Sequence, residues 1–187
     1  MKLKKYPAVQ FLEYAAAKLA VAPLYLLPRR AALHVGEWLG EAMYRLMWKR
    51  RQLGFHNLTL AFGDELSATE KERILRLNFR NLGKSLAEVV HFPKSCAADV
   101  LARVTITGQE HCAEAFRQGR GMIYLTAHIG NWEMASHAQA ASGYPSTIVV
   151  RPLDNRFLDR VTTARRTMFG NTLIARVSVK QISHAPD

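Results

Sequence analysis

The sequence has 187 residues, which is enough for one domain with a substantial hydrophobic core but too few for two domains of ordinary size. A hydrophobic share of 49% and a charged share of 22% exclude a disordered chain. The net charge of +11 lies at the two ends: residues 1–63 hold ten Lys/Arg against three Asp/Glu, residues 64–150 hold nine of each, and residues 151–187 hold seven against three. The basic ends indicate either partners with phosphate groups, in lipid or nucleic acid, or a solvated face that keeps the protein soluble.

The N-terminal residues predict an apolar helix behind a basic start. Three lysines stand within the first five residues, and an apolar stretch then runs from Tyr6 to Leu27, interrupted by a few polar residues and Pro23. No small-residue cleavage motif closes it, so a removable signal peptide is not expected. The stretch fits a tilted membrane span or an interfacial helix with its lysines on the cytoplasmic side, and a buried core helix is the alternative. Basic residues that flank apolar sequence favour lipid over nucleic acid.

Two more helices are expected in the first half of the chain. Arg29–Arg51 carries apolar residues at helical spacing and closes with three cations, which suit a helix C-terminus. Ser67 opens the next helix, because Glu70 three residues on completes a capping box, and this helix should end before Pro93.

Beyond about Arg103 the pattern alternates between short apolar runs and amphipathic stretches. Strands are expected at Met122–Thr126, Thr147–Val150 and Leu173–Val177, and helices at Glu110–Gln118, Glu133–Ala141 and Leu158–Met168. This alternation predicts a parallel sheet in an α/β fold. The expected regions are an N-terminal membrane anchor or interfacial helix over residues 1–27, a helical region over 28–102, and an α/β region over 103–187.

The segment Thr126-Ala-His-Ile-Gly-Asn-Trp-Glu133 holds the best candidates for chemistry. It joins the expected end of a buried strand to the start of a helix, which is where sites gather in α/β sheets. Glu133 can turn back to bond one imidazole nitrogen of His128 and leave the other nitrogen as a general base. Gly130 lets backbone N–H groups approach a ligand, and free N–H groups at the helix start can stabilise an oxyanion. This set suits deprotonation of a hydroxyl for attack on an ester or thioester.

Other interpretations have less in their favour. A histidine and a glutamate also meet at this spacing by chance. A metal site of His128, Glu133 and His137 lacks the H-E-x-x-H spacing and a further nearby ligand, and a nucleophilic serine lacks a G-x-S-x-G context. Cys96 and Cys112 form no CxxC motif, and we expect buried or incidental thiols in a reducing compartment. No nucleic-acid partner is expected either, because helix-turn-helix, zinc and aromatic–basic signatures are missing.

Leu125-Thr-Ala-His-Ile-Gly-Asn-Trp-Glu133 resembles the H-x4-D/E block of glycerolipid-type acyltransferases. Its Gly-Asn-Trp-Glu ending is similar to that of the bacterial lipid A biosynthesis (late) acyltransferases. Four more stretches resemble this family: the helix before the catalytic domain, the strand that leads into the block, the segment after the next strand, and the second block, at residues 78–88, 119–126, 151–155 and 169–176. The resemblance covers roughly residues 10–176.

The resemblance implies a fold, a reaction and partners. It implies a helical region followed by a parallel-sheet glycerolipid-acyltransferase-like domain. The donor would be an acyl carrier protein thioester, and the acceptor a hydroxyl on a phosphorylated glycolipid, the lipid A precursor. The place would be the cytoplasmic side of the cell inner membrane. No metal or bound cofactor is implied.

The resemblance also implies roles for single residues. His128 would be the catalytic base and Glu133 its orienting partner. Arg151 and Arg176 would bind phosphate or sugar-acid groups, although both also fit as ordinary surface residues. Arg165 and Arg166 are weaker candidates for the same role, and Gly130 and Asn131 complete the substrate-binding set.

The resemblance ends near the C-terminus. Members of the family continue well beyond the second block, whereas this chain ends eleven residues after Arg176, and Val177–Asp187 does not resemble that continuation. The α/β domain is therefore expected to be incomplete at its C-terminus. Two alternatives to lipid A acylation stay open: an acyltransferase for another glycolipid, and a catalytically incomplete relative that only binds membranes.

Overall fold

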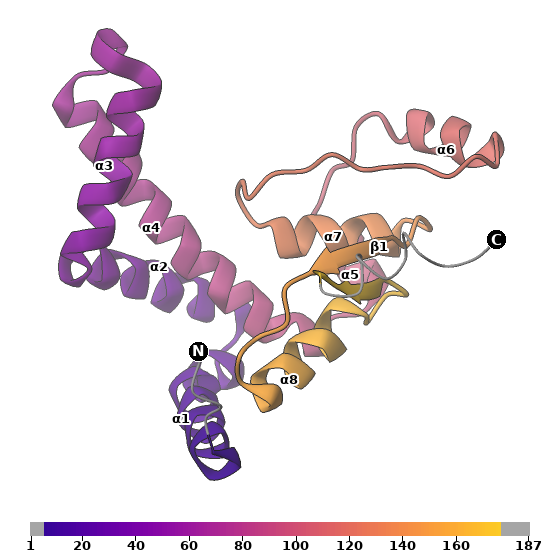
Figure 1. The fold of residues 1–187 in the computed structure, drawn as a ribbon, viewed down its shortest axis with the longest axis horizontal. Helices are drawn as coiled ribbons and strands as arrows, with labels where there is room; N and C mark the ends of the chain where they lie inside the picture. Colours follow the sequence, from indigo (N-terminus) through magenta and orange to yellow (C-terminus); the bar gives the residue numbers. More distant parts are fainter. Residues whose placement is uncertain (1–5, 177–187) are drawn as a thin grey trace. The chain divides into compact units, whose positions relative to one another are not determined.

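The computed structural model describes residues 6–176, and these divide into two compact units (Figure 1). Val21–His91 form one unit, and residues 6–20 with 92–176 form the other. We call the first the helical unit and the second the site-bearing unit. The three functional regions expected from the sequence stay a prediction, because these units are defined by packing and not by function.

The first helix, α1 (Pro7–Leu26), covers the apolar stretch expected to be helical. Its proline, Pro23, lies inside the helix near the C-terminal end. Among the helices of residues 6–176, none is at once long enough and apolar enough to cross a bilayer.

The helical unit is built on two helices in backbone contact. α2 (Arg29–Leu46) packs along α4 (Ala68–His91), and three glycines line the contact. A Cβ atom on Gly83 would overlap the carbonyl oxygen of Gly36, and one on Gly40 would overlap the carbonyl oxygen of Phe79. The two helices approach this closely only because these positions carry no side chain.

Apolar clusters and ion pairs flank the glycine contact. Leu24, Ala32, Ala87 and Val90 form one buried cluster, and Tyr44, Leu75 and Phe79 form another. At the rim, Arg29 Nη2 lies 2.5 Å from Glu88 Oε1, and Arg80 pairs with Glu37 in the same way between α4 and α2. Burial of the two clusters supplies the main stabilisation, and the partly exposed ion pairs add little to it.

The expected single helix Arg29–Arg51 is wrong, because the chain turns at Met47. This residue has φ −91° and ψ 58°, and a new helix, α3 (Trp48–Phe62), begins directly after it. The turn brings Phe55 and Leu58 of α3 back onto the apolar cluster between α2 and α4. A straight helix would carry both side chains away from that cluster, so tertiary packing overrides the continuous helical pattern.

The start and the end of α4 agree with the sequence. Ser67 and Glu70 form the expected capping box: the Ser67 backbone N–H donates to the Glu70 carboxylate at 2.9 Å, and the Glu70 N–H donates to Ser67 Oγ at 3.2 Å. The helix ends at His91, ahead of Pro93. Short elements that the sequence did not predict flank it: η1 (Gly63–Glu65), η2 (Phe92–Lys94) and α5 (Ala97–Leu101).

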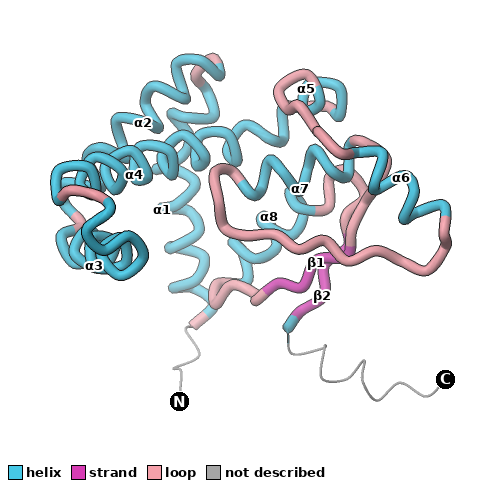
Figure 2. Tube along the Cα trace, turned by 90° about the horizontal axis from the view of Figure 1, so that it is seen from above, coloured by secondary structure: helices cyan, strands magenta, loops and turns pink. Residues whose placement is uncertain are grey.

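The site-bearing unit contains a parallel strand pair with helices around it (Figure 2). In chain order it continues with α6 (Gln109–Arg117), α7 (Trp132–Ala141), β1 (Thr147–Val150), α8 (Arg156–Arg166) and β2 (Thr172–Ala175). β1 and β2 run parallel, with Thr147 opposite Thr172 and Val150 opposite Ala175. The described residues are thus mostly helical with a small parallel sheet, which agrees in part with the expected α/β fold.

The buried side chain of Asn155 fixes the start of α8 and joins it to α1. Asn155 caps α8 by accepting hydrogen bonds from the backbone N–H groups of Phe157 and Leu158. Its amide nitrogen donates to the backbone oxygen of Gln10 at 2.7 Å and to Glu13 Oε2 at 3.1 Å, both on α1. The first helix is therefore bonded to the loop that follows β1.

The expected strand Met122–Thr126 is wrong. The segment is irregular, and the side chains of Ile123 and Leu125 are 97% and 100% exposed. A strand is stable only when its backbone pairs with a neighbour, and within residues 6–176 β1 and β2 pair with each other. The last expected strand is present as β2, but its predicted final residue, Val177, lies outside the described residues.

Candidate active site

The candidate site is centred on the start of α7, where a glycine and an asparagine turn the chain into the helix. Gly130 has φ +58°, a left-handed conformation that favours glycine, and the space where a Cβ would stand is open. Asn131 caps the helix, because its Oδ1 accepts a hydrogen bond from the Met134 N–H at 3.0 Å. Both residues therefore have a local structural role besides the expected substrate contact.

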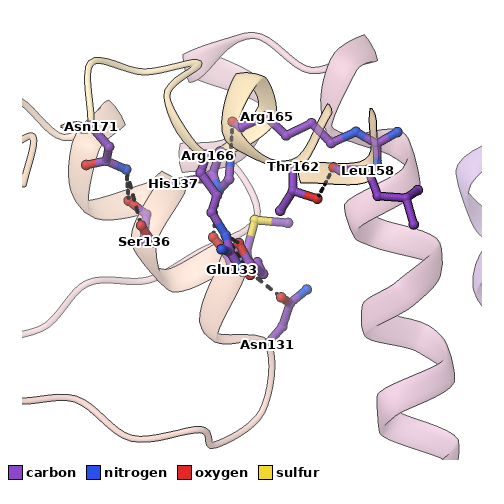
Figure 3. Close-up of polar contacts among 10 residues, drawn as sticks. Asn131, Glu133, Ser136, His137, Leu158, Thr162, Arg165, Arg166 and Asn171 are labelled. Carbon is purple, nitrogen blue, oxygen red and sulfur yellow. Dashed lines mark hydrogen bonds and ion pairs between the residues drawn. The ribbon is translucent and has the colours of Figure 1, made fainter. Parts of the chain in front are cut away.

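Glu133, in the first turn of α7, is held by Arg166 at the end of α8 (Figure 3). Arg166 Nε lies 3.1 Å from each carboxylate oxygen, and Nη2 lies 2.5 Å from Oε1. The side chains are 17% and 27% exposed, so water screens the pair only partly. The carboxylate raises the pKa of the Arg166 guanidinium, mainly through these hydrogen bonds. The result is a fixed anion at the helix start.

His137 reinforces the same junction from the interior. Its Nδ1 lies 2.6 Å from the Glu133 carbonyl oxygen and its Nε2 lies 2.9 Å from the Arg165 carbonyl oxygen, so the ring bridges α7 and α8 (Figure 3). The ring is buried against Phe92 and Phe169, with centroid distances of 4.3 and 5.5 Å. His137 is therefore part of the support of Glu133.

His128 lies in the exposed segment before α7. Its ring packs against Trp132, with 5.0 Å between the centroids. The Glu133 carboxylate bonds Arg166, and no hydrogen bond joins it to His128 in the part of the chain that the structure describes. The predicted His128–Glu133 hydrogen bond is thus not present here, because Glu133 projects from the helix toward α8.

A polar contact joins the His128 segment to α7. Gln139 Nε2 donates to the hydroxyl of Tyr124 at 2.6 Å. The exposed backbone around Leu125 is therefore attached on its N-terminal side to the helix that carries Glu133.

The two predicted phosphate-binding arginines follow paired strands. Arg151 comes directly after β1 and Arg176 directly after β2, and the parallel register pairs the residues just before them. The two arginines therefore leave the sheet side by side at its C-terminal edge. Both are exposed, and Arg151 Nη2 lies 4.0 Å from Asp154 Oδ1. Exposed guanidinium groups in this arrangement suit an anionic ligand.

Sequence reasoning underrated two residues of the site. From the sequence, Arg166 is only a weak candidate for phosphate binding, and His137 appears only as a possible metal ligand. The helical spacing from Glu133 to His137 and the cations that close α8 were the available signals. Among residues 6–176, no three His, Cys, Asp or Glu side chains lie together as a metal site.

The site-bearing unit thus carries Arg151 and Arg176 at the edge of the sheet, and His128 and Glu133 around the start of α7. This combination directs attention to acyltransferases. The sequence model of the bacterial lipid A biosynthesis acyltransferases matches residues 3–185. The chain belongs to this family, which confirms the expected membership.

Two curated relatives match the chain equally well. The chain is 28% identical over 160 residues to the lipid A biosynthesis palmitoleoyltransferase of Escherichia coli (strain K12) and to the lipid A biosynthesis acyltransferase of Shigella flexneri. The match covers 83% of this chain and 50% of each relative, so the chain spans about half the length of both. No solved structure matches it.

Proposed function

We propose that this protein transfers a fatty acyl group from an acyl carrier protein thioester to a hydroxyl of a phosphorylated glycolipid, the lipid A precursor. The family and the names of the two relatives support the reaction class and the acceptor. One observation carries the proposal: His128 lies on an exposed segment, five residues before Glu133, and Arg166 holds the Glu133 carboxylate in place. The proposed place is the cytoplasmic side of the inner membrane, with α1 as an interfacial attachment.

His128 is the general base of the proposed reaction. Its imidazole takes the proton of the acceptor hydroxyl, the oxygen attacks the thioester carbonyl, and the carbon–sulfur bond breaks. The proton then passes to the departing thiolate, which restores the neutral imidazole. In this proposal the carboxylate of Glu133, which Arg166 holds in place, stabilises the transient imidazolium.

Arg151 and Arg176 bind the phosphate groups of the acceptor in this proposal. Their neighbouring positions at the end of the parallel pair offer two guanidinium groups to one anion. Bidentate contacts of this kind are directional as well as strong, so they would orient the acceptor. Gly130 and Asn131, at the start of α7, are the other substrate-binding residues of this proposal.

The test is acyl transfer by membranes that contain the protein, supplied with labelled acyl carrier protein thioester and lipid A precursor. His128→Ala should lower the rate by about two to four orders of magnitude, and Glu133→Gln should lower it less. His111→Ala is the matched control, because His111 is an exposed histidine of the same unit outside the site, and it should keep the wild-type rate.

Two results would contradict the proposal. Equal rates for His128→Ala and the wild type would remove the general base. A wild-type chain that stays on membranes without any turnover would favour the alternative of a catalytically incomplete, membrane-binding relative.

A further inference from the structure

The turn between α2 and α3 exposes several large apolar side chains. We call residues 45–53 the elbow; it spans the last turn of α2, Met47 and the first turns of α3 (Figure 1). Leu46 is 83% exposed, Trp48 54% and Leu53 50%. Large apolar side chains this exposed, and this close in sequence, are typical of surfaces that meet another apolar phase.

The same stretch carries only positive charge. Residues 42–63 contain no Asp or Glu; of their four cations, Arg45 pairs with Glu41 of α2, and Lys49, Arg50 and Arg51 remain. The guanidinium of Arg51 lies over the rings of Tyr44 and Trp48, 5.2 and 5.5 Å from their centroids. Lys49 and Arg50 are exposed in the first turn of α3. Apolar side chains with cations beside them match the acyl region and the phosphates of a lipid surface.

We propose that the elbow is a binding surface for anionic phospholipid bilayers. Leu46, Met47 and Trp48 insert at the level of the headgroups, and Lys49 and Arg50 contact lipid phosphates. Tryptophan is favoured at this depth because its ring is apolar while its N–H is polar. This contact is separate from α1 and does not rest on acyl transfer.

Charge complementarity favours a lipid surface over other occupants. A nucleic acid would leave Leu46 and Leu53 in water, since phosphate contacts need cations alone. A bilayer accommodates both classes of side chain at one turn, with the long basic side chains extended toward the phosphates.

The first measurement uses Trp48 as a local probe in the full chain. Trp38→Phe and Trp132→Phe leave Trp48 as the single tryptophan. Vesicles of phosphatidylglycerol and phosphatidylcholine with brominated acyl chains should quench its emission and shield it from acrylamide. Vesicles of phosphatidylcholine alone should bind the protein more weakly and quench less.

The second measurement compares two leucines of similar exposure by vesicle flotation. Leu46→Ser should lower the affinity for anionic vesicles at least about tenfold, because an inserted leucine leaves water almost completely. Leu60→Ser is the matched control: Leu60 is 72% exposed near the other end of α3, close to Asp64 and Glu65, and its loss should leave affinity unchanged. Lys49→Gln and Arg50→Gln should each lower affinity about fivefold.

Circular dichroism should show unchanged helix content in these surface variants. The proposal is overturned if Trp48 stays accessible to acrylamide on vesicles that carry the protein, or if Leu46→Ser and Leu60→Ser weaken binding equally. It is also overturned if Leu46→Ser leaves vesicle affinity unchanged and instead alters the sedimentation coefficient, which would assign the elbow to a protein partner or a second copy.

Discussion

The helical unit and the site-bearing unit are stabilised in different ways. α2 and α4 touch through Gly36, Gly40 and Gly83, so their fit depends on the absence of side chains. The site-bearing unit depends instead on polar side chains that join elements distant in sequence, such as Glu133 with Arg166. The close fit of the two backbones is the main requirement of the first contact, with ion pairs only at its rim, whereas charge and hydrogen bonding determine the second. The two units should therefore be destabilised by different kinds of substitution.

The largest expected effect is in the glycine contact. Gly83→Ala should destabilise the protein by about 3 kcal/mol or more, since the new methyl group meets the backbone of Gly36, which cannot move aside. Gly54→Ala is the control: its methyl group meets only the side chain of Leu75, whose end can shift where a backbone cannot, and it should cost less. Urea unfolding measures the stability of both variants. Equal losses of stability would contradict the prediction, because they would show that α2 and α4 can move apart to accept the methyl group at position 83.

A smaller effect is expected at the ion pair of the site. Arg166→Gln should cost about 1–3 kcal/mol, because Glu133 is left largely buried without its charged partner. Arg117→Gln breaks an exposed pair with Glu114 and should change stability little. Adding Glu133→Gln to Arg166→Gln should recover part of the loss in urea unfolding. If the double variant loses the full sum, the two side chains are not coupled.

The smallest effect is expected at the start of α4, and it depends on pH. The Ser67 hydroxyl and backbone N–H lower the pKa of the Glu70 carboxyl from its ordinary 4.5. This stabilisation is complete above pH 4.5 and is lost as the pH falls through the lowered folded-state value. Ser67→Ala should cost about 1 kcal/mol at neutral pH and less in acid. A loss that stays constant or grows in acid would exclude the carboxylate as the partner.

The accuracy of the sequence predictions followed the range of the interactions involved. The helix from Ser67 to Pro93 was predictable because its capping box is complete within four residues. The parallel pair was predictable because β1 and β2 are short apolar runs on either side of a helix. The turn at Met47 was missed because its cause is packing against α4, a separate element.

In the candidate site, too, only the local interactions could be predicted from the sequence. His128 and Glu133 stood out by their spacing, but the partner of Glu133 lies 33 residues further on, where no local pattern indicates it. The strand at Met122–Thr126 failed for a related reason: apolar composition is local, whereas strand pairing requires a second segment.

The hydrogen bonds of Asn155 have a practical consequence for trimming the chain. Its amide donates to Gln10 and Glu13, and the ring of Phe157 packs 5.7 Å from Phe11. A recombinant protein shortened at its N-terminus to improve solubility would leave a buried amide unsatisfied and expose an aromatic face at the start of α8. Any fall in activity of such a protein would report damage to the fold of the site-bearing unit as well as loss of the proposed attachment of α1 to lipid.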